Sequence, residues 1–243
     1  TYTKEKTVFK VWSPEAESMT LNLYKTGSDK EEGAEDLGKY KMTKGDKGVW
    51  EYTYTGDLVN TYYTYRAVVD GQSYGEAVDP YAKAVAGLRE WGVEEIDPIN
   101  HGYRARVVKD DFDWGTCKSP LIPLEDLVIY EMHIRGFTKH DSSGVEFPGT
   151  FDAVREKLPY LKELGINAVE FMPIFEFDEM HDHRVVDGNN LIDYWGYNTV
   201  NYFSPNTAYA SNPERNKEGN ELKRVIKLLN ENGIEVILDV VFN

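Results

Sequence analysis

The sequence is poor in cysteine, has no long apolar run and carries no excess of positive charge. Cys117 is its only cysteine, so the chain forms no internal disulfide and offers no thiol pair for redox chemistry. No apolar stretch approaches the roughly 18–20 residues of a membrane span, and no signal peptide is visible. A net charge of −15 argues against nucleic acid and anionic membrane as partners, because both are polyanions. Neutral sugars are compatible with that charge. The compartment stays open between cytoplasmic and secreted.

The chain is long and rich in aromatic side chains. Its 243 residues are enough for one large domain or two ordinary ones. The 17 tyrosines and 5 tryptophans suit surfaces that stack on sugar rings, and they suit β-sheet cores equally well. We favour the sheet-core interpretation.

The first half of the chain has the period-two alternation of β-strands, interrupted by turn residues such as Asp70 and Gly71. The predicted strands are 7–12, 19–24, 49–54 and 62–69. Short alternating strands at this spacing predict an antiparallel β-sandwich over residues 1–115. Trp12 and Trp50 fit the alternation as core residues better than as exposed platforms for sugar.

After a linker at residues 116–125, residues 126–243 alternate strands with helices. Buried strands are predicted at 127–131, 166–171 and 234–243, and amphipathic helices at 150–164 and 222–229. Thr150 is a candidate N-cap of the first helix, and Gly165 ends it. This order predicts a parallel α/β fold, either doubly wound or a barrel. No glycine-rich loop follows the first strand, which argues against nucleotide binding.

Each predicted strand of the second half carries a carboxylate near its carboxyl end, namely Glu131, Glu170 and Asp239. In an α/β barrel that edge of the sheet holds the chemistry. The interpretation that we favour for Glu131 and Glu170 is structural: they pair inside the barrel mouth with residues such as His133 and Arg135.

Two weaker patterns are set aside. His181 and His183 lie one residue apart on a polar segment and lack a third ligand at useful spacing, so a metal site there is disfavoured. Ser142, Ser143 and Ser204 have no nucleophile-elbow context, so a serine hydrolase is disfavoured as well.

Several motifs resemble one known family. Residues 9–14 (FKVWSP) and 78–82 (VDPYA) are similar to the N-terminal β-sandwich of the debranching branch of the α-amylase family, a module related to glycogen- and starch-binding domains. Four further motifs resemble successive signature regions of that family, in the same order: YEMHIRGFT at 130–138, GINAVEFMP at 165–173, DYWGYN at 193–198 and DVVFN at 239–243. The resemblance implies that residues 126–243 form the first part, about three strand-helix units, of a catalytic (β/α)8 TIM barrel.

The resemblance also implies roles for individual residues. Tyr197 stacks on the sugar ring at the cleaved position, with Trp195 in a substrate-binding or supporting role. Asp239 holds the hydrogen-bond network of the active site. Asn243 is structural, and in calcium-dependent relatives the matching asparagine is a metal ligand. The resemblance implies no required cofactor and leaves calcium open as a bound ion.

The implied chemistry is retaining glycoside hydrolysis, which needs a nucleophile and an acid/base carboxyl about 5–5.5 Å apart. In this family those groups lie on the fourth and fifth strands, so no catalytic residue is assigned in this chain. We expect the chain to continue past Asn243 and to be inactive alone. The expected substrate is a branched α-glucan (pullulan, starch or glycogen) cleaved at α-1,6 linkages. The alternatives are an α-1,4-acting hydrolase of the same family and a non-catalytic α-glucan-binding protein.

Overall fold

The computed structural model describes residues 1–85, 91–92, 103–181, 183–211 and 217–242. The chain divides into two compact units, the first made of residues 1–89 and 94–110 and the second of residues 90–93 and 111–243. Among the helices of these described ranges, none has the length and apolar content that a bilayer crossing requires.

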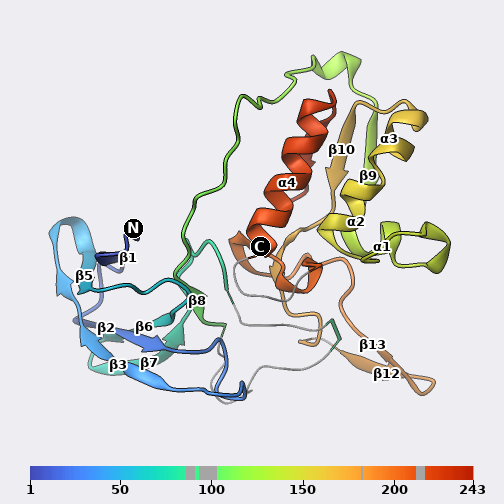
Figure 1. The fold of residues 1–243 in the computed structure, drawn as a ribbon. Helices are drawn as coiled ribbons and strands as arrows, with labels where there is room; N and C mark the ends of the chain where they lie inside the picture. Colours follow the sequence, from blue (N-terminus) through green and yellow to red (C-terminus); the bar gives the residue numbers. More distant parts are fainter. Residues whose placement is uncertain (86–90, 93–102, 182, 212–216, 243) are drawn as a thin grey trace. The chain divides into compact units, whose positions relative to one another are not determined.

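The first unit is an antiparallel β-sandwich, as predicted (Figure 1). One sheet has the order β1 (Lys6–Trp12), β5 (Val49–Thr55), β4 (Thr43–Lys44), and the other has the order β3 (Asp36–Lys41), β2 (Ser18–Tyr24), β6 (Tyr62–Val69), β7 (Gln72–Ala77), with β8 (Ala105–Arg106) paired to β6. Alternate side chains of both sheets fill one core, among them Phe9, Leu21, Trp50, Tyr63 and Tyr65. Alternating apolar residues that predicted the strands therefore also form the core.

Trp12 corrects one expectation from the sequence, because its side chain is 67% exposed while that of Trp50 is 3% exposed. In β1 the buried positions are the odd-numbered Thr7 and Phe9. Because side chains alternate between the two faces of a strand, the even-numbered Trp12 lies on the opposite face. The indole Nε1 of Trp12 donates to the carbonyl oxygen of Lys47 at 2.9 Å. The core interpretation is thus confirmed for Trp50 and wrong for Trp12.

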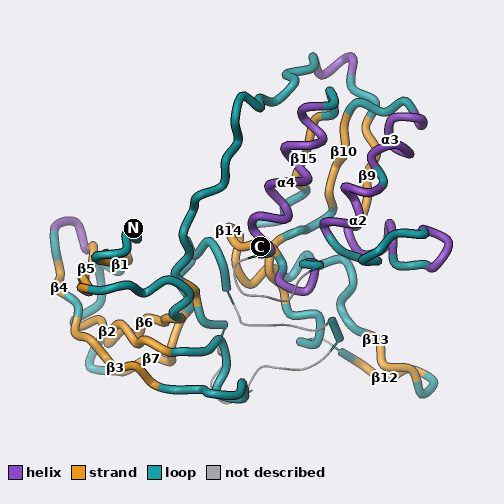
Figure 2. The backbone as a smooth tube through the Cα atoms, viewed as in Figure 1, coloured by secondary structure: helices purple, strands orange, loops and turns teal. Residues whose placement is uncertain are grey.

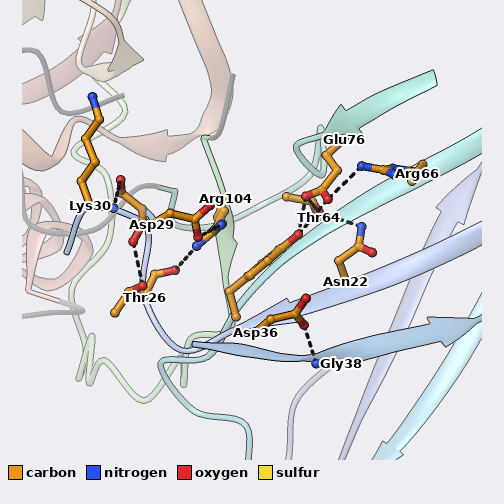
Figure 3. Close-up of polar contacts among 12 residues, drawn as sticks. Asn22, Thr26, Asp29, Lys30, Asp36, Gly38, Thr64, Arg66, Glu76 and Arg104 are labelled. Atoms are coloured by element: carbon orange, nitrogen blue, oxygen red, sulfur yellow. Dashed lines mark hydrogen bonds and ion pairs between the residues drawn. The ribbon is translucent and has the colours of Figure 1, made fainter. Parts of the chain in front are cut away.

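The second face of the β2–β6–β7 sheet carries a polar network around Glu76 (Figure 3). Its carboxylate accepts hydrogen bonds from the hydroxyls of Tyr24 at 2.7 Å and Thr64 at 2.6 Å, and from the guanidinium of Arg66 at 3.2 Å. The guanidinium of Arg104 lies 3.6 Å from the centre of the Tyr24 ring. Burial, followed by the hydrogen bond to Glu76, raises the pKa of Tyr24. The network ties three strands together through side chains that point away from the core.

The second unit contains a three-stranded parallel sheet of order β15 (Glu235–Leu238), β10 (Ala168–Phe171), β9 (Ile129–Met132), with α1 (Ile134–Thr138), α2 (Phe151–Glu156), α3 (Leu158–Leu164) and α4 (Glu218–Glu231) (Figures 1 and 2). Two hairpins pair β11 (Phe175–Phe177) with β14 (Thr199–Pro205) and β12 (Arg184–Val186) with β13 (Asn189–Leu191). Single helical turns complete the chain at η1 (Asp46–Gly48), η2 (Leu124–Asp126), η3 (Asp141–Ser143) and η4 (Thr207–Tyr209). The three strand-helix units of a partial barrel are therefore confirmed.

The predicted helix over 150–164 is interrupted in the structure. Its start is as expected, since the Thr150 hydroxyl accepts from the backbone N–H of Ala153 at 3.3 Å, and Gly165 ends it in the left-handed conformation at φ +80°. Lys157, at φ −86° and ψ 4°, separates α2 from α3. Pro159 lies in the first turn of α3, where its missing N–H is tolerated but where it cannot continue an earlier helix.

Candidate functional site

The parallel sheet separates a helix-facing side from a side that carries carboxylates. Val169 and Phe171 are fully buried in the core that α2, α3 and α4 help to build. Glu170 lies between them, and the register places it directly beside Glu131 of β9 and Ile237 of β15. Because neighbouring residues of a parallel sheet point to the same face, the two glutamates form a row on the side away from the helices.

The expected pairing of Glu131 and Glu170 with His133 and Arg135 is wrong. The chain leaves β9 after Met132, and His133 becomes the N-cap of α1, so its ring turns toward the first turn of that helix. The guanidinium of Arg135 instead lies 4.6 Å from the centre of the Trp91 ring. The two glutamates are therefore acidic groups of the carboxylate face, without those partners.

Tyr197 and Asp239 meet at this face. The Tyr197 hydroxyl donates to the carboxylate Oδ2 of Asp239, which directly follows β15. The Asp239 backbone N–H donates to the carbonyl oxygen of Phe171 at 3.0 Å, which extends the pairing with β10 by one residue. The hydrogen bond to Asp239, burial, and then the charges of Asp239, Glu131 and Glu170 raise the pKa of Tyr197 to about 12. The phenol is thus a neutral donor among three carboxylates.

Trp195 lies beside Tyr197 with 63% of its side chain exposed. The centres of the two rings are 6.3 Å apart, and their planes are at 84°. Residues 192–195, 197 and 198 line a surface pocket of about 600 Å³. An exposed indole next to a phenol is suited to stack on the apolar face of a sugar ring, the role that the resemblance implied for Tyr197.

The loop that carries both rings is tightly constrained. We call residues 193–197 the 193–197 loop. Gly196 has φ +82°, and a Cβ placed there would lie 2.6 Å from Cε1 of the buried Phe177. The Gly196 N–H donates to the Asp193 carboxylate at 3.3 Å, and the Asp193 N–H donates to the carbonyl of Glu179 at 2.9 Å. Both the positive φ and the close approach require glycine at this position.

An aromatic cluster beneath the loop was not foreseen from the sequence. Trp91 stacks on Tyr209 with ring centres 5.8 Å apart and planes at 19°, and it meets the edges of Tyr194 and Phe177 at 6.0 Å and 5.9 Å. The His133 ring stacks on Tyr194 at 4.4 Å and 12°. Trp91 lies far from the others in the sequence, where the strand pattern weakens, so no local signal pointed to its place.

The residues considered for a metal site lie partly outside the described ranges. Among the residues that the structure describes, no group of three or more His, Cys, Asp or Glu side chains could hold a metal ion. Asn243, the residue proposed as a calcium ligand, lies outside the described residues, as does Asp182. The Nδ1 atom of His183 lies 2.7 Å from the carbonyl oxygen of Met180.

Comparison with known proteins finds two family matches along the chain, one in each of its two units. Residues 1–82 match carbohydrate-binding module 48 (isoamylase N-terminal domain), and residues 130–243 match the α-amylase catalytic domain. Chloroplastic isoamylase 1 of Arabidopsis thaliana is 38% identical over 97% of this chain, and pullulanase of Bacillus subtilis (strain 168) is 35% identical over 100% of it. This chain spans 32% of each of those two proteins, about a third of their length.

Solved structures agree with this division. The crystal structure of a pullulanase from Anoxybacillus sp. LM18-11 complexed with maltotriose has a TM-score of 0.79 and 35% identity, and the alignment covers 100% of this chain and 33% of that one. Pullulanase from Bacillus acidopullulyticus gives a TM-score of 0.79 at 31% identity, over 100% of this chain and 29% of that one. The chain belongs to the α-amylase family of glycoside hydrolases, in the debranching branch that contains the isoamylases and pullulanases.

Proposed function

We propose that this chain is part of a retaining glycoside hydrolase that cleaves α-1,6 branch linkages in pullulan, starch or glycogen. The observation that carries the proposal is the meeting of Tyr197, Trp195 and Asp239 at the carboxyl ends of β10 and β15. Two aromatic rings and a carboxylate network are what a site needs to hold a neutral, hydroxyl-rich ring. The similarity to isoamylases and pullulanases supports the choice of α-glucan as that ligand.

In this proposal each residue binds or orients the substrate. Tyr197 lies against the sugar ring at the cleaved position, and its hydrogen bond to Asp239 keeps the phenol in one orientation. Trp195 extends the apolar surface by one ring. Asp239 organises the hydrogen bonds of the site and is neither nucleophile nor general acid. The resemblance to the α-amylase family implies that those two carboxyl groups come from barrel strands other than β9, β10 and β15, so we expect no turnover from these 243 residues alone.

Calcium at Asn243 stays a proposal without a role in the reaction. Calcium takes about six to eight oxygen ligands, commonly including carboxylates. Among the described residues, no group of three or more His, Cys, Asp or Glu side chains could hold a metal ion. No step of the proposed reaction is assigned to the ion.

The preference for α-1,6 linkages is supported by the similarity to isoamylases and pullulanases over nearly the whole chain. Product analysis tests it, with pullulan and linear α-1,4-glucan offered to the protein purified from its native source. Release of maltotriose from pullulan, with little attack on the linear chain, is the expected result. Cleavage of α-1,4 bonds alone would replace the proposal with the amylase-type alternative. Binding of both polymers without any cleavage would favour a non-catalytic glucan-binding protein.

A further inference from the structure

Both ring nitrogens of His133 are occupied by backbone groups. Nδ1 lies 3.0 Å from the backbone nitrogen of Gly136 in the first turn of α1, and Nε2 lies 2.6 Å from the carbonyl oxygen of Tyr194. The first contact caps a helix, whereas the second reaches a loop far along the chain. His133 thus connects the end of strand β9 with the 193–197 loop.

These two partners determine where the proton of the imidazole lies. The Gly136 N–H can only donate, so Nδ1 must present its lone pair. The Tyr194 carbonyl can only accept, so Nε2 must carry the hydrogen. The neutral Nε2–H tautomer satisfies both partners, and no other protonation state does. Burial, with the nearby Arg135 charge, lowers the pKa of His133, although the bond to Tyr194 and the charge of Asp193 oppose this.

Ring packing reinforces the same contact. The Tyr194 ring lies flat on His133, and a Cβ on Gly136 would be only 3.0 Å from the Tyr194 hydroxyl oxygen. The Tyr209 hydroxyl lies 3.2 Å from Nε2, so it can share the same hydrogen. Tyr194 directly precedes Trp195, and Tyr197 follows three residues after Tyr194. A shift of the Tyr194 backbone would therefore move both rings of the pocket.

We infer that neutral His133 is the positioning residue of the 193–197 loop, which it holds through its Nε2–H bond to the Tyr194 carbonyl. His133 does not itself line the pocket but contacts Tyr194, which does, so it acts through the loop. The importance of this positioning for glucan binding rests on the proposed function. The hydrogen bond between His133 and the 193–197 loop does not depend on that function.

Two measurements on the 243-residue chain test this without any glucan. In the wild type, two-bond ¹⁵N–¹H correlation spectra of the imidazoles should show His133 with Nε2 protonated and Nδ1 bare. This pattern should persist at pH values below the ordinary histidine pKa of about 6.5. A proton on Nδ1 in the native state would overturn the inference. This measurement needs no variant and so does not depend on a variant's folding.

The second measurement is amide hydrogen exchange of residues 193–197 in matched variants. His133→Gln keeps an N–H donor near the Nε2 position, whereas His133→Asn can replace only the Nδ1 acceptor. Loss of one hydrogen bond should speed loop exchange about tenfold in His133→Asn, and His133→Gln should stay within about twofold of wild type. His140→Gln, an exposed histidine that caps η3 through Ser142, is the control and should change nothing in the loop. Equal exchange in the Gln and Asn variants would refute the positioning role.

Discussion

Replacing Gly196 by alanine should destabilise the second unit well beyond the usual effect of one methyl group. The left-handed φ of +82° costs an alanine about 1–2 kcal/mol. The new Cβ would also lie 2.6 Å from Cε1 and 2.8 Å from Cδ1 of Phe177, which is fully buried and packed against Trp91. Overpacking of this kind costs about 1–3 kcal/mol. We therefore expect a loss of about 2–5 kcal/mol in the free energy of unfolding.

Gly165→Ala is the matched control for this substitution. Gly165 has φ +80°, almost the same as Gly196, but a Cβ there meets nothing within 4 Å. It should cost only the backbone term of about 1–2 kcal/mol. Urea unfolding followed through the amide signals of Val169 and Phe171 reports on the second unit alone, which avoids assuming that both units unfold together. Equal losses in the two variants would show that Phe177 yields freely and would refute the packing argument.

Three further predictions follow from single side chains. Spectrophotometric titration of wild type against Tyr197→Phe should reveal one tyrosine with a pKa of about 12, and Asp239→Asn should bring it down toward 10. Because the pKa of Tyr197 is higher in the folded than in the unfolded chain, the Tyr197–Asp239 hydrogen bond contributes its full stability below pH about 10. That contribution is lost as the pH rises through about 12. An ordinary pKa for Tyr197 would contradict the hydrogen bond to Asp239. Trp195→Ala should change the unfolding free energy by less than about 0.5 kcal/mol yet weaken maltotriose binding, and a large stability loss would show that the indole is not a free platform. Trp50→Ala should lower the free energy of unfolding by about 3–5 kcal/mol, whereas Trp12→Ala should lower it by about 1 kcal/mol. Similar urea midpoints for these two variants would contradict the assignment of Trp50 to the core and Trp12 to the outer face.

Local patterns predicted the elements of the fold well. The alternation around Phe9 and Leu21 predicted the sandwich, and apolar residues such as Val225 and Leu229 predicted the buried stripe of α4. The cap at Thr150 followed from its position before the helix. These features depend on neighbours a few residues away, so the sequence alone carries the necessary information.

Features that depend on distant partners were predicted less well. Trp12 was assigned to the core from the strand alternation, but the buried positions of β1 are Thr7 and Phe9, so Trp12 lies on the outward face. The resemblance pointed to Tyr197 and Asp239, but their hydrogen bond is a tertiary contact that only the folded chain shows. His133 and Trp91 contact Tyr194 only when the 193–197 loop folds against them. No periodicity or spacing in the sequence encodes such contacts.

The most direct test of the account is a maltotriose titration of the ¹⁵N-labelled chain followed by NMR. If the pocket at the carboxyl ends of the strands is a glucan site, the Trp195 indole N–H and the amides of residues 192–198 should shift in a saturable way. The amides of β12 and β13 should shift less, since they do not line the pocket. Shifts confined to residues 1–110, with residues 192–198 unchanged at saturating sugar, would contradict the claim that Trp195 and Tyr197 bind the substrate.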